Sequence, residues 1–149
     1  MQTSGTALPP VRARTVSATP DTFGFRESSA FQPELEYLEG ERRLGRLATV
    51  DGTGQPHVVP VGWSYNPELG TIDTVGHKLA ASKKFRNVRT NPKVAFVVDD
   101  LASVNPWRPR SVMVQGNAEA MEASDDQPPL IRITPEKVFS WGLDRQAVA

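Results

Sequence analysis

The chain has 149 residues and a mass of 16.3 kDa, which predicts one compact domain. Its 17 basic and 17 acidic side chains cancel, so no global charge favours nucleic acid. Cysteine is absent and only His57 and His77 could supply nitrogen ligands, which excludes disulfide scaffolds, cysteine nucleophiles and structural zinc sites. No apolar stretch resembles a membrane span or a secretory signal, so we expect a soluble, cytoplasmic, metal-independent protein.

Residues 1–32 are rich in Pro, Ser, Thr and Ala and show no helical or strand periodicity. They predict a flexible arm that precedes a single domain over residues 33–149. Three aromatic side chains are unusual in a linker and are candidates to pin the arm onto the domain or onto a second subunit: Phe23, Phe25 and Phe31. The modest apolar fraction of 38% also favours an exposed segment or a surface buried against a partner subunit.

A short helix is predicted over residues 33–45, PELEYLEGERRLG. Pro33 suits a first helical turn, and acidic residues near the start with Arg42 and Arg43 near the end suit the helix dipole. Gly45 is expected to follow the last turn. The side chains expected to face inward are Leu35, Tyr37 and Leu38.

Most of the remaining chain predicts strands joined by turns such as DGTGQP and NPELG. One helix interrupts them at 80–89, where Ala81, Phe85 and Val88 have helical spacing. About six sequentially adjacent strands predict a mainly β fold, a closed or half-closed antiparallel barrel. The strand at 93–100 is apolar almost throughout, so we expect both of its faces to be buried. The strands are predicted at 44–50, 57–65, 71–76, 93–100, 111–121 and 130–143.

The most informative chemical signal is residues 74–98, which contain no acidic residue and six of the 17 basic ones. A helix N-terminus offers free N–H groups and a positive dipole end, and added Ser and Lys side chains suit a phosphate group. A solvated basic helix face is the alternative. The residues in the first turns of this predicted helix are Ser82, Lys83, Lys84 and Asn87.

The strand HVVPVGWSY (57–65) contains two residues that strands usually avoid. Pro60 cannot donate to a sheet ladder, and Gly62 weakens a strand. Alternation places both on one face with Val58, and this small, flat face suits the close approach of a planar ring system. An edge strand with a bulge is the alternative. The opposite face carries His57, Val59, Val61 and Trp63.

Two tryptophans are candidates for a pocket wall. In NPWRPR (105–110), Trp107 lies between prolines beside Arg108 and Arg110, so this loop either clamps an anionic ligand or caps the barrel. Trp141 is either part of the core or a lid that reaches into a neighbouring site.

Catalytic signals are weak in this sequence. No dinucleotide-binding, Walker or nucleophile-elbow motif is present, which argues against Rossmann dehydrogenases, NTPases and ordinary hydrolases. His57 and His77 are expected to be structural or surface residues. Among Ser64, Tyr65 and His57 no catalytic acid stands out, so the catalytic residues stay unassigned.

The ordered segments 44–63, 72–121 and 129–144 resemble the pyridoxamine-phosphate-oxidase-like split β-barrel family. The motifs that carry the resemblance include LGRLATV, HVVPVGW, SKKFRNVR and NPWRPR. Within the family, the chain is most similar to reductases that depend on a deazaflavin, coenzyme F-420. The resemblance implies a six-stranded antiparallel split β-barrel with short flanking helices, and a homodimer that holds its cofactor at the subunit interface.

The resemblance also implies roles for individual residues. The Ser-Lys-Lys helix start would bind the cofactor phosphate, the strand around Pro60 would lie beside the ring, and Trp141 would arrive from the partner subunit. Flavin-using relatives have Arg-Gln where this chain has Arg110 and Ser111, and they carry Arg and Lys on the ring-binding strand, so FMN is the less favoured cofactor. The predicted cofactor-binding residues are Val59, Pro60, Val61, Gly62, Thr74, Ser82, Lys83, Lys84, Asn87, Trp107, Arg110 and Trp141.

Three hypotheses about the function follow from these residues and from the resemblance. The first is an oxidoreductase that transfers a hydride from reduced F-420 to an activated C=C or C=N bond of a small, natural-product-like substrate. The second is an FMN-dependent oxidase or reductase on the same barrel. The third is a non-enzymatic barrel that binds a cofactor or another planar ligand without turnover. Neither nucleic acid nor membranes are expected partners.

Overall fold

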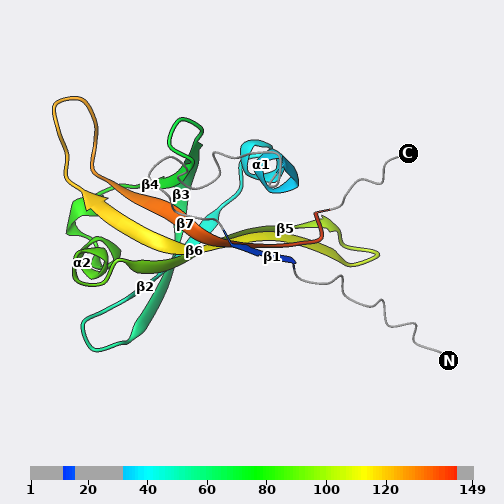
Figure 1. The fold of residues 1–149 in the computed structure, drawn as a ribbon, viewed down its shortest axis with the longest axis horizontal. Coiled ribbons are helices and arrows are strands. Elements are labelled where there is room, and N and C mark those ends of the chain that lie inside the picture. The colour runs from blue at the N-terminus through cyan, green and yellow to red at the C-terminus, as the bar shows by residue number, and fades with distance from the viewer. Residues whose placement is uncertain (1–11, 16–31, 144–149) are drawn as a thin grey trace.

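The structure is a computed structural model that describes residues 12–15 and 32–143. Its strands form one antiparallel sheet in the order β1-β7-β4-β3-β2-β5-β6, and β6 also pairs with β7, which closes a barrel (Figure 1). The elements are β1 (Arg12–Thr15), α1 (Gln32–Glu39), β2 (Gly45–Val50), β3 (Pro56–Asn66), β4 (Thr71–Val75), the short 3₁₀ helix η2 (Leu79–Ala81), α2 (Lys83–Thr90), β5 (Lys93–Ser103), β6 (Arg108–Met121) and β7 (Leu130–Trp141).

Strands β2 to β7 form the barrel, which confirms the predicted mainly β architecture of six antiparallel strands with two short helices. Strand β7 pairs with β6 along its whole length. On its other side it pairs with β4 near Ile131 and with β1 near Val138.

Strand β1 was not predicted, because it falls in the segment expected to be a flexible arm. Its four residues, RART, are too few to show periodicity, and their pairing with β7 depends on an edge that the sequence does not reveal. Phe23, Phe25 and Phe31 lie outside the described residues, as does most of the proposed arm, so its boundary at residue 32 stays a prediction.

Helix α1 ends at Glu39, earlier than the predicted boundary at residue 45. Gly40 follows, and glycine is a poor residue for continuing a helix. The predicted inward-facing side chains are confirmed, since Leu35, Tyr37 and Leu38 are all buried.

The predicted helix at 80–89 is divided in two by Ser82, which has an extended backbone between η2 and α2. Phe85 and Val88 are buried as expected. Ala81, which shares the predicted helical spacing with these two residues, lies instead in η2, before α2 begins, and is exposed.

The barrel interior is filled by alternate residues of each strand. Phe96 is completely buried, and Trp63 meets it edge-on with ring centroids 5.4 Å apart. Around β5, burial alternates: Val94 and Val98 are buried with Phe96, whereas the intervening side chains are only half-buried. The prediction that both faces of this strand are buried is therefore wrong.

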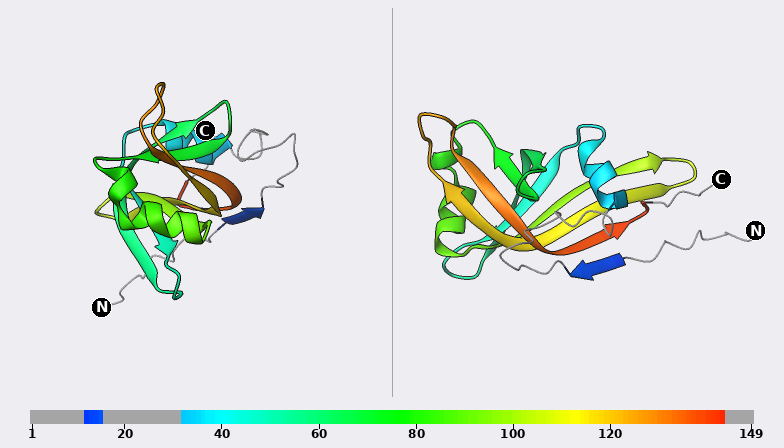
Figure 2. Two further views of the ribbon diagram at one scale, coloured as in Figure 1. Left: turned by 90° about the vertical axis from the view of Figure 1, so that its left-hand side faces the viewer. Right: turned by 45° about the horizontal axis from the view of Figure 1, so that its top comes forward.

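The long axis of the molecule runs from α2 at one end to the β5–β6 hairpin at the other (Figures 1 and 2). No helix in the described part of the chain is long and apolar enough to cross a lipid bilayer.

Candidate functional site

The outward face of β3 is apolar, flat and open to solvent. Val58 is 63% exposed, and Pro60 and Gly62 are exposed on the same face. Val75 of β4 pairs with Gly62 and extends this surface, whereas Val61 is buried in the barrel. The predicted alternation along β3 is thus confirmed. We call these outward residues the β3 face: Val58, Pro60, Gly62 and Val75.

Strand β3 changes its pairing partner between Val61 and Gly62. Residues 56–61 pair with β2 and residues 62–66 pair with β4. Pro60 therefore lies where β3 has a neighbouring strand on one side only, a position in a sheet that tolerates proline. The edge-strand interpretation is correct for this half of β3, but its register with β2 runs without a bulge.

The β3 face has the shape that a planar ring system requires. A Cβ added to Gly62 would meet only the Val75 carbonyl oxygen, at 3.9 Å, so the space above the glycine is open. Any side chain there would occupy that space. Small residues at this point thus leave room for a flat ligand to lie close to the backbone.

The basic segment begins directly after β4. Ser82 caps α2: its Oγ accepts a hydrogen bond from the Phe85 N–H at 3.3 Å and donates to the Leu79 carbonyl at 2.6 Å. The hydroxyl is therefore already engaged in forming the helix start.

The two lysines of the helix start differ in their surroundings. Lys83 Nζ lies 3.7 Å from Asp51 Oδ2, at the turn between β2 and β3. Hydrogen bonds from the Thr53 hydroxyl and from the backbone lower the pKa of Asp51 to about 2, so this carboxylate is ionised at neutral pH. Lys84 has no acidic partner among the described residues, which makes it the more available cation for an anionic ligand.

Several residues that were predicted to contact the cofactor ring or phosphate have side chains that point into the protein instead. Asn87 is buried, and its Nδ2 donates to Thr49 Oγ1 at 3.0 Å, which joins α2 to β2. Thr74 is completely buried, and its Oγ1 has no hydrogen-bond partner in the described part of the chain. Val59 and Val61 pack against the core. None of these side chains reaches the β3 face within one chain.

Arg110 belongs to an ion cluster that sequence reasoning missed. Its Nε and Nη2 donate to the two Asp100 oxygens at 2.9 and 2.6 Å. Arg43 Nε donates to the same carboxylate at 2.8 Å, and the Tyr37 hydroxyl donates to it at 3.0 Å. Asp100 lies opposite Arg110 in the β5–β6 ladder, a pairing that becomes visible only once the register of the two strands is known.

The surroundings of Asp100 favour its ionised form. Burial acts to raise its pKa, but the hydrogen bonds from Arg110, Arg43 and Tyr37 outweigh it and lower the pKa to about 2. The hydrogen bonds of this cluster hold α1 and the following loop against the base of the β5–β6 hairpin.

The two tryptophans predicted as candidates for a pocket wall, Trp107 and Trp141, lie at the same end of the molecule as this cluster. Trp107 is 59% exposed at the end of the hairpin. Trp141 is half-buried opposite Ser111, and its indole N–H is buried without a hydrogen-bond partner among residues 32–143.

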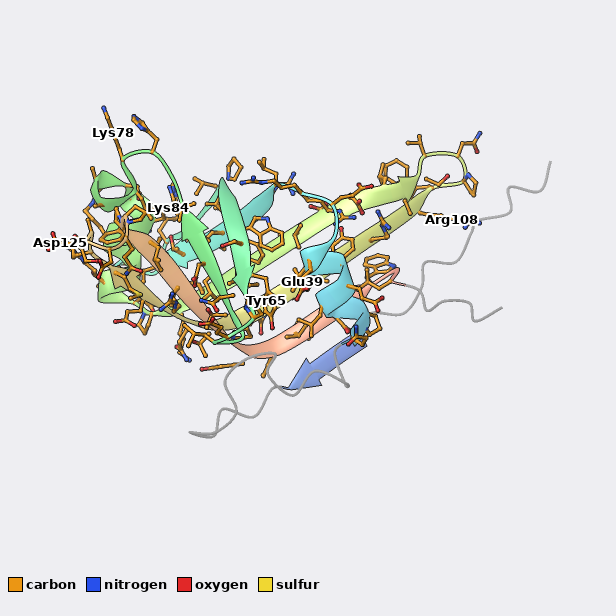
Figure 3. All side chains as sticks on the ribbon, turned by 90° about the horizontal axis from the view of Figure 1, so that it is seen from above. Glu39, Tyr65, Lys78, Lys84, Arg108 and Asp125 are labelled. Carbon is orange, nitrogen blue, oxygen red and sulfur yellow. The ribbon has the colours of Figure 1, made fainter. Side chains whose placement is uncertain are left out.

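The predicted site residues therefore separate into two groups. Figure 3 shows Lys84 on α2 and Arg108 in the β5–β6 hairpin, toward opposite ends of the folded molecule. Residues at these two ends cannot line one small-molecule site within a single chain.

A cavity of about 580 Å³ lies between the end of α1 and the second half of β3. Its wall on the β3 side includes Trp63, Ser64 and Tyr65, and its other wall includes Glu39 and Arg42. Burial, followed by the nearby charge of Glu39, raises the pKa of Tyr65. The sequence pointed weakly to Ser64 and Tyr65 and missed Glu39, because no local pattern brings the end of a helix next to this strand.

A family model described as pyridoxamine 5'-phosphate oxidase matches residues 31–148. The chain belongs to this family. A curated relative, the 5a,11a-dehydrotetracycline/5a,11a-dehydrooxytetracycline reductase of Streptomyces rimosus subsp. rimosus, is 40% identical over 119 residues, which cover 76% of this chain and 83% of that protein. By homology to that reductase, this member of the pyridoxamine 5'-phosphate oxidase family is an oxidoreductase.

Solved structures share the fold of this family member at lower sequence identity. A conserved hypothetical protein of Mycobacterium tuberculosis superposes with a TM-score of 0.59 at 20% identity, and covers 91% of this chain and 94% of its own. An F-420 reductase superposes with a TM-score of 0.52 at 21% identity, and covers 70% of this chain and 94% of its own. At these identities, the two similarities establish the barrel fold.

Proposed function

We propose that this oxidoreductase is a reductase that uses reduced coenzyme F-420 to deliver a hydride to an activated C=C or C=N bond of a multi-ring, natural-product-like substrate. The observation that carries the proposal is the open apolar β3 face, together with the basic start of α2, where Lys83 lies 3.7 Å from Asp51 in the turn that leads into β3. The relation to a dehydrotetracycline reductase supports the substrate class.

A reduced deazaflavin supplies a hydride and little one-electron chemistry, so the chain has to bind, orient and exclude water. Lys84 and the free N–H groups at the start of α2 would hold the phosphate of the cofactor. Pro60 and Gly62 would let the ring approach the backbone closely. No nucleophilic side chain is needed for this chemistry.

We propose that the complete site forms between two copies of the chain. Such an arrangement brings the hairpin end of one copy, with Trp107 and Trp141, to the β3 face of the other. Exposed apolar side chains at both ends support it: Val58 and Val75 at one end, and Leu101, Val104 and Trp107, the last 59% exposed, at the other. Large exposed apolar side chains gathered in this way are typical of interaction surfaces.

Binding titrations with oxidised F-420 and, separately, FMN test the cofactor. Saturable binding of F-420 at micromolar concentrations or below, with weak FMN binding, is the expected result. Binding of FMN alone would replace the deazaflavin with a flavin in this proposal. Binding of neither would refute it.

The Lys84→Ala variant tests the phosphate site. Loss of a charge-assisted hydrogen bond costs about 1.5–3 kcal/mol, so the Kd for F-420 should rise roughly 10–150-fold. Lys93→Ala removes an exposed lysine at the start of β5 and is the matched control, with an expected change below about twofold. Equal Kd values for wild type and Lys84→Ala would place the phosphate elsewhere.

Turnover is tested with 5a,11a-dehydrotetracycline as the substrate probe. Mixing it with reduced F-420 and the protein should oxidise the cofactor, followed by its absorbance, and yield a product heavier by two hydrogens. A product without this mass change would refute C=C reduction.

A further inference from the structure

We propose that Arg46 of β2 forms the charged edge of the ring site, and that its guanidinium favours the ionised form of the deazaflavin ring over a neutral ring. The inference rests on the proposed function, since it requires a cofactor ring on the β3 face. It adds to that function a residue that decides which ring system the face prefers.

Arg46 lies directly beside the β3 face. It is paired with Pro60 in the β2–β3 ladder, and directly opposed residues of antiparallel strands point to the same side of a sheet. The burial pattern agrees, because Gly45 and Leu47 on either side of Arg46 are buried whereas Arg46 is exposed. The Cβ atoms of opposed residues are roughly 4.5–5.5 Å apart, so the Arg46 side chain begins next to any ring that covers Pro60.

The Arg46 guanidinium keeps hydrogen-bond donors for a ligand. Its Nη1 donates to Asp99 Oδ1 at 2.5 Å, and both side chains are about half exposed. A guanidinium has five N–H donors, and Arg46 makes no other hydrogen bond within the described part of the chain. Asp99 therefore holds the guanidinium at the edge of the face and leaves most of its donors available.

None of the four residues of the β3 face is charged, so any charge near a bound ring comes from the neighbouring elements. Asp73 of β4 is paired with Ser64, is buried, and accepts two hydrogen bonds from Arg132 at 3.0 Å each, so its charge is compensated within the chain. Among the charged groups around the face, Arg46 is the one that is paired in the ladder with a residue of the face. These groups are Arg46 on β2, Lys93 and Asp99 on β5, Asp73 on β4, Arg132 on β7, and Asp51, Lys83 and Lys84 around the start of α2.

The charge of Arg46 distinguishes an ionised ring from a neutral one. The oxidised deazaflavin of F-420 carries a ring hydroxyl that is conjugated with the electron-poor pyrimidine ring, so it ionises near neutral pH and spreads a negative charge over the ring system. The ring of FMN has no such hydroxyl and stays neutral at this pH. A nearby guanidinium stabilises the anion, and its planar shape suits contact with a flat ring. Because the negative charge is delocalised, either orientation of the ring along β3 places part of it near Arg46.

The first experiment measures the pKa of the ring hydroxyl of protein-bound, oxidised F-420 by an absorbance titration against pH. A unit charge about 5 Å from the ring at a solvent-exposed edge lowers this pKa by roughly 0.5–1 pH unit. The pKa of the bound ring should therefore be higher in Arg46→Gln than in wild type by that amount. Arg46→Lys keeps the charge and should retain most of the effect. Asp99→Asn keeps an acceptor for the guanidinium but removes the opposing charge, so it should lower the pKa of the ring below the wild-type value.

The second experiment measures the Kd for F-420 above and below the pKa of the ring. Above it, Arg46→Gln should bind F-420 roughly 3–10-fold more weakly than wild type, which is the same pKa difference expressed as affinity. Below it, where the ring is neutral, the two Kd values should converge. Arg89→Gln is the matched control, because it removes an equal charge from a side chain whose partners are Glu122 and the Phe85 ring. It should leave both the Kd and the pKa of the bound ring close to the wild-type values.

These results separate the role of Arg46 from the proposed function. Equal pKa values of the bound ring in wild type and Arg46→Gln, or an equal rise in Arg46→Gln and Arg89→Gln, would overturn the role of Arg46 and leave F-420 binding intact. An unchanged or higher pKa in Asp99→Asn would contradict the electrostatic account in the same way. A wild-type protein that binds no F-420 would refute the proposed function and this inference together.

Discussion

Replacing Asp100 by Asn should destabilise the protein by about 2 kcal/mol at pH 7, because it removes the charge that organises the ion cluster. The carboxylate accepts hydrogen bonds from Arg43, Arg110 and Tyr37, and its side chain is 24% exposed. Asn resembles a protonated Asp in shape and charge. The fall of its pKa from 3.8 to about 2, at about 1.4 kcal/mol per pKa unit, therefore corresponds to an expected loss of about 2–2.5 kcal/mol.

The loss of stability in Asp100→Asn should depend on pH, because it reflects the ionised form of the carboxylate. A carboxylate whose pKa is depressed by folding contributes its full stabilisation above its ordinary pKa and loses it as the pH falls toward 2. The difference between wild type and Asp100→Asn should thus be complete at pH 7 and fall to roughly half at pH 3. Urea unfolding followed by tryptophan fluorescence, at one protein concentration, measures the free energy at both pH values.

The neighbouring Asp99 provides the matched control. It pairs with Arg46 at 2.5 Å, but both side chains are about half exposed. Surface pairs of this kind contribute about 0–1 kcal/mol, so Asp99→Asn should have a small effect. Equal losses for the two variants, or a loss in Asp100→Asn that is the same at pH 7 and pH 3, would refute the reasoning.

Other stability predictions follow from the packing. Gly45→Ala should cost about 1–3 kcal/mol in chemical denaturation, because the added Cβ would overlap the Phe96 ring and approach Trp63 to 2.8 Å. A loss smaller than that of Gly54→Ala, where the site is open but φ is +88°, would contradict this account. Asn87→Ala should cost about 1–3 kcal/mol, since it leaves the Thr49 hydroxyl buried without its partner. Asn87→Asp also removes the Nδ2 donor and places a carboxylate at this buried position, so it should cost at least as much as Asn87→Ala, and a smaller loss would contradict this account.

The architecture could be predicted because its signals are local. Turn motifs, strand alternation and the spacing of Phe85 and Val88 each depend on residues close together in the chain, and all of them reappear in the structure. The errors occurred where a distant group decides the outcome. Strand β1 exists through its pairing with β7, and the apolar run of β5 is covered fully on one face only.

The residue types at the candidate site could be predicted from the sequence, but the contacts between those residues could not. The small outward residues of β3 and the basic helix start could be read from the sequence, because strand and helix periods fix which residues share a face. The engagement of Arg110 with Asp100 and of Asn87 with Thr49 depends on contacts between residues far apart in sequence. The same is true of the cavity that places Glu39 beside Tyr65.

Lys84 and the hairpin that carries Arg108 and its neighbour Trp107 lie toward opposite ends of the folded molecule (Figure 3), and this separation has a genetic consequence. If each site draws one end from each of two copies, two alleles that are defective at different ends can rescue one another. A Lys84→Ala chain paired with a Trp107→Ala chain contains one site with both defects and one site with neither. Co-expression of the two variants would then restore about a quarter of the wild-type sites if the copies mix at random, although neither variant alone has any intact site.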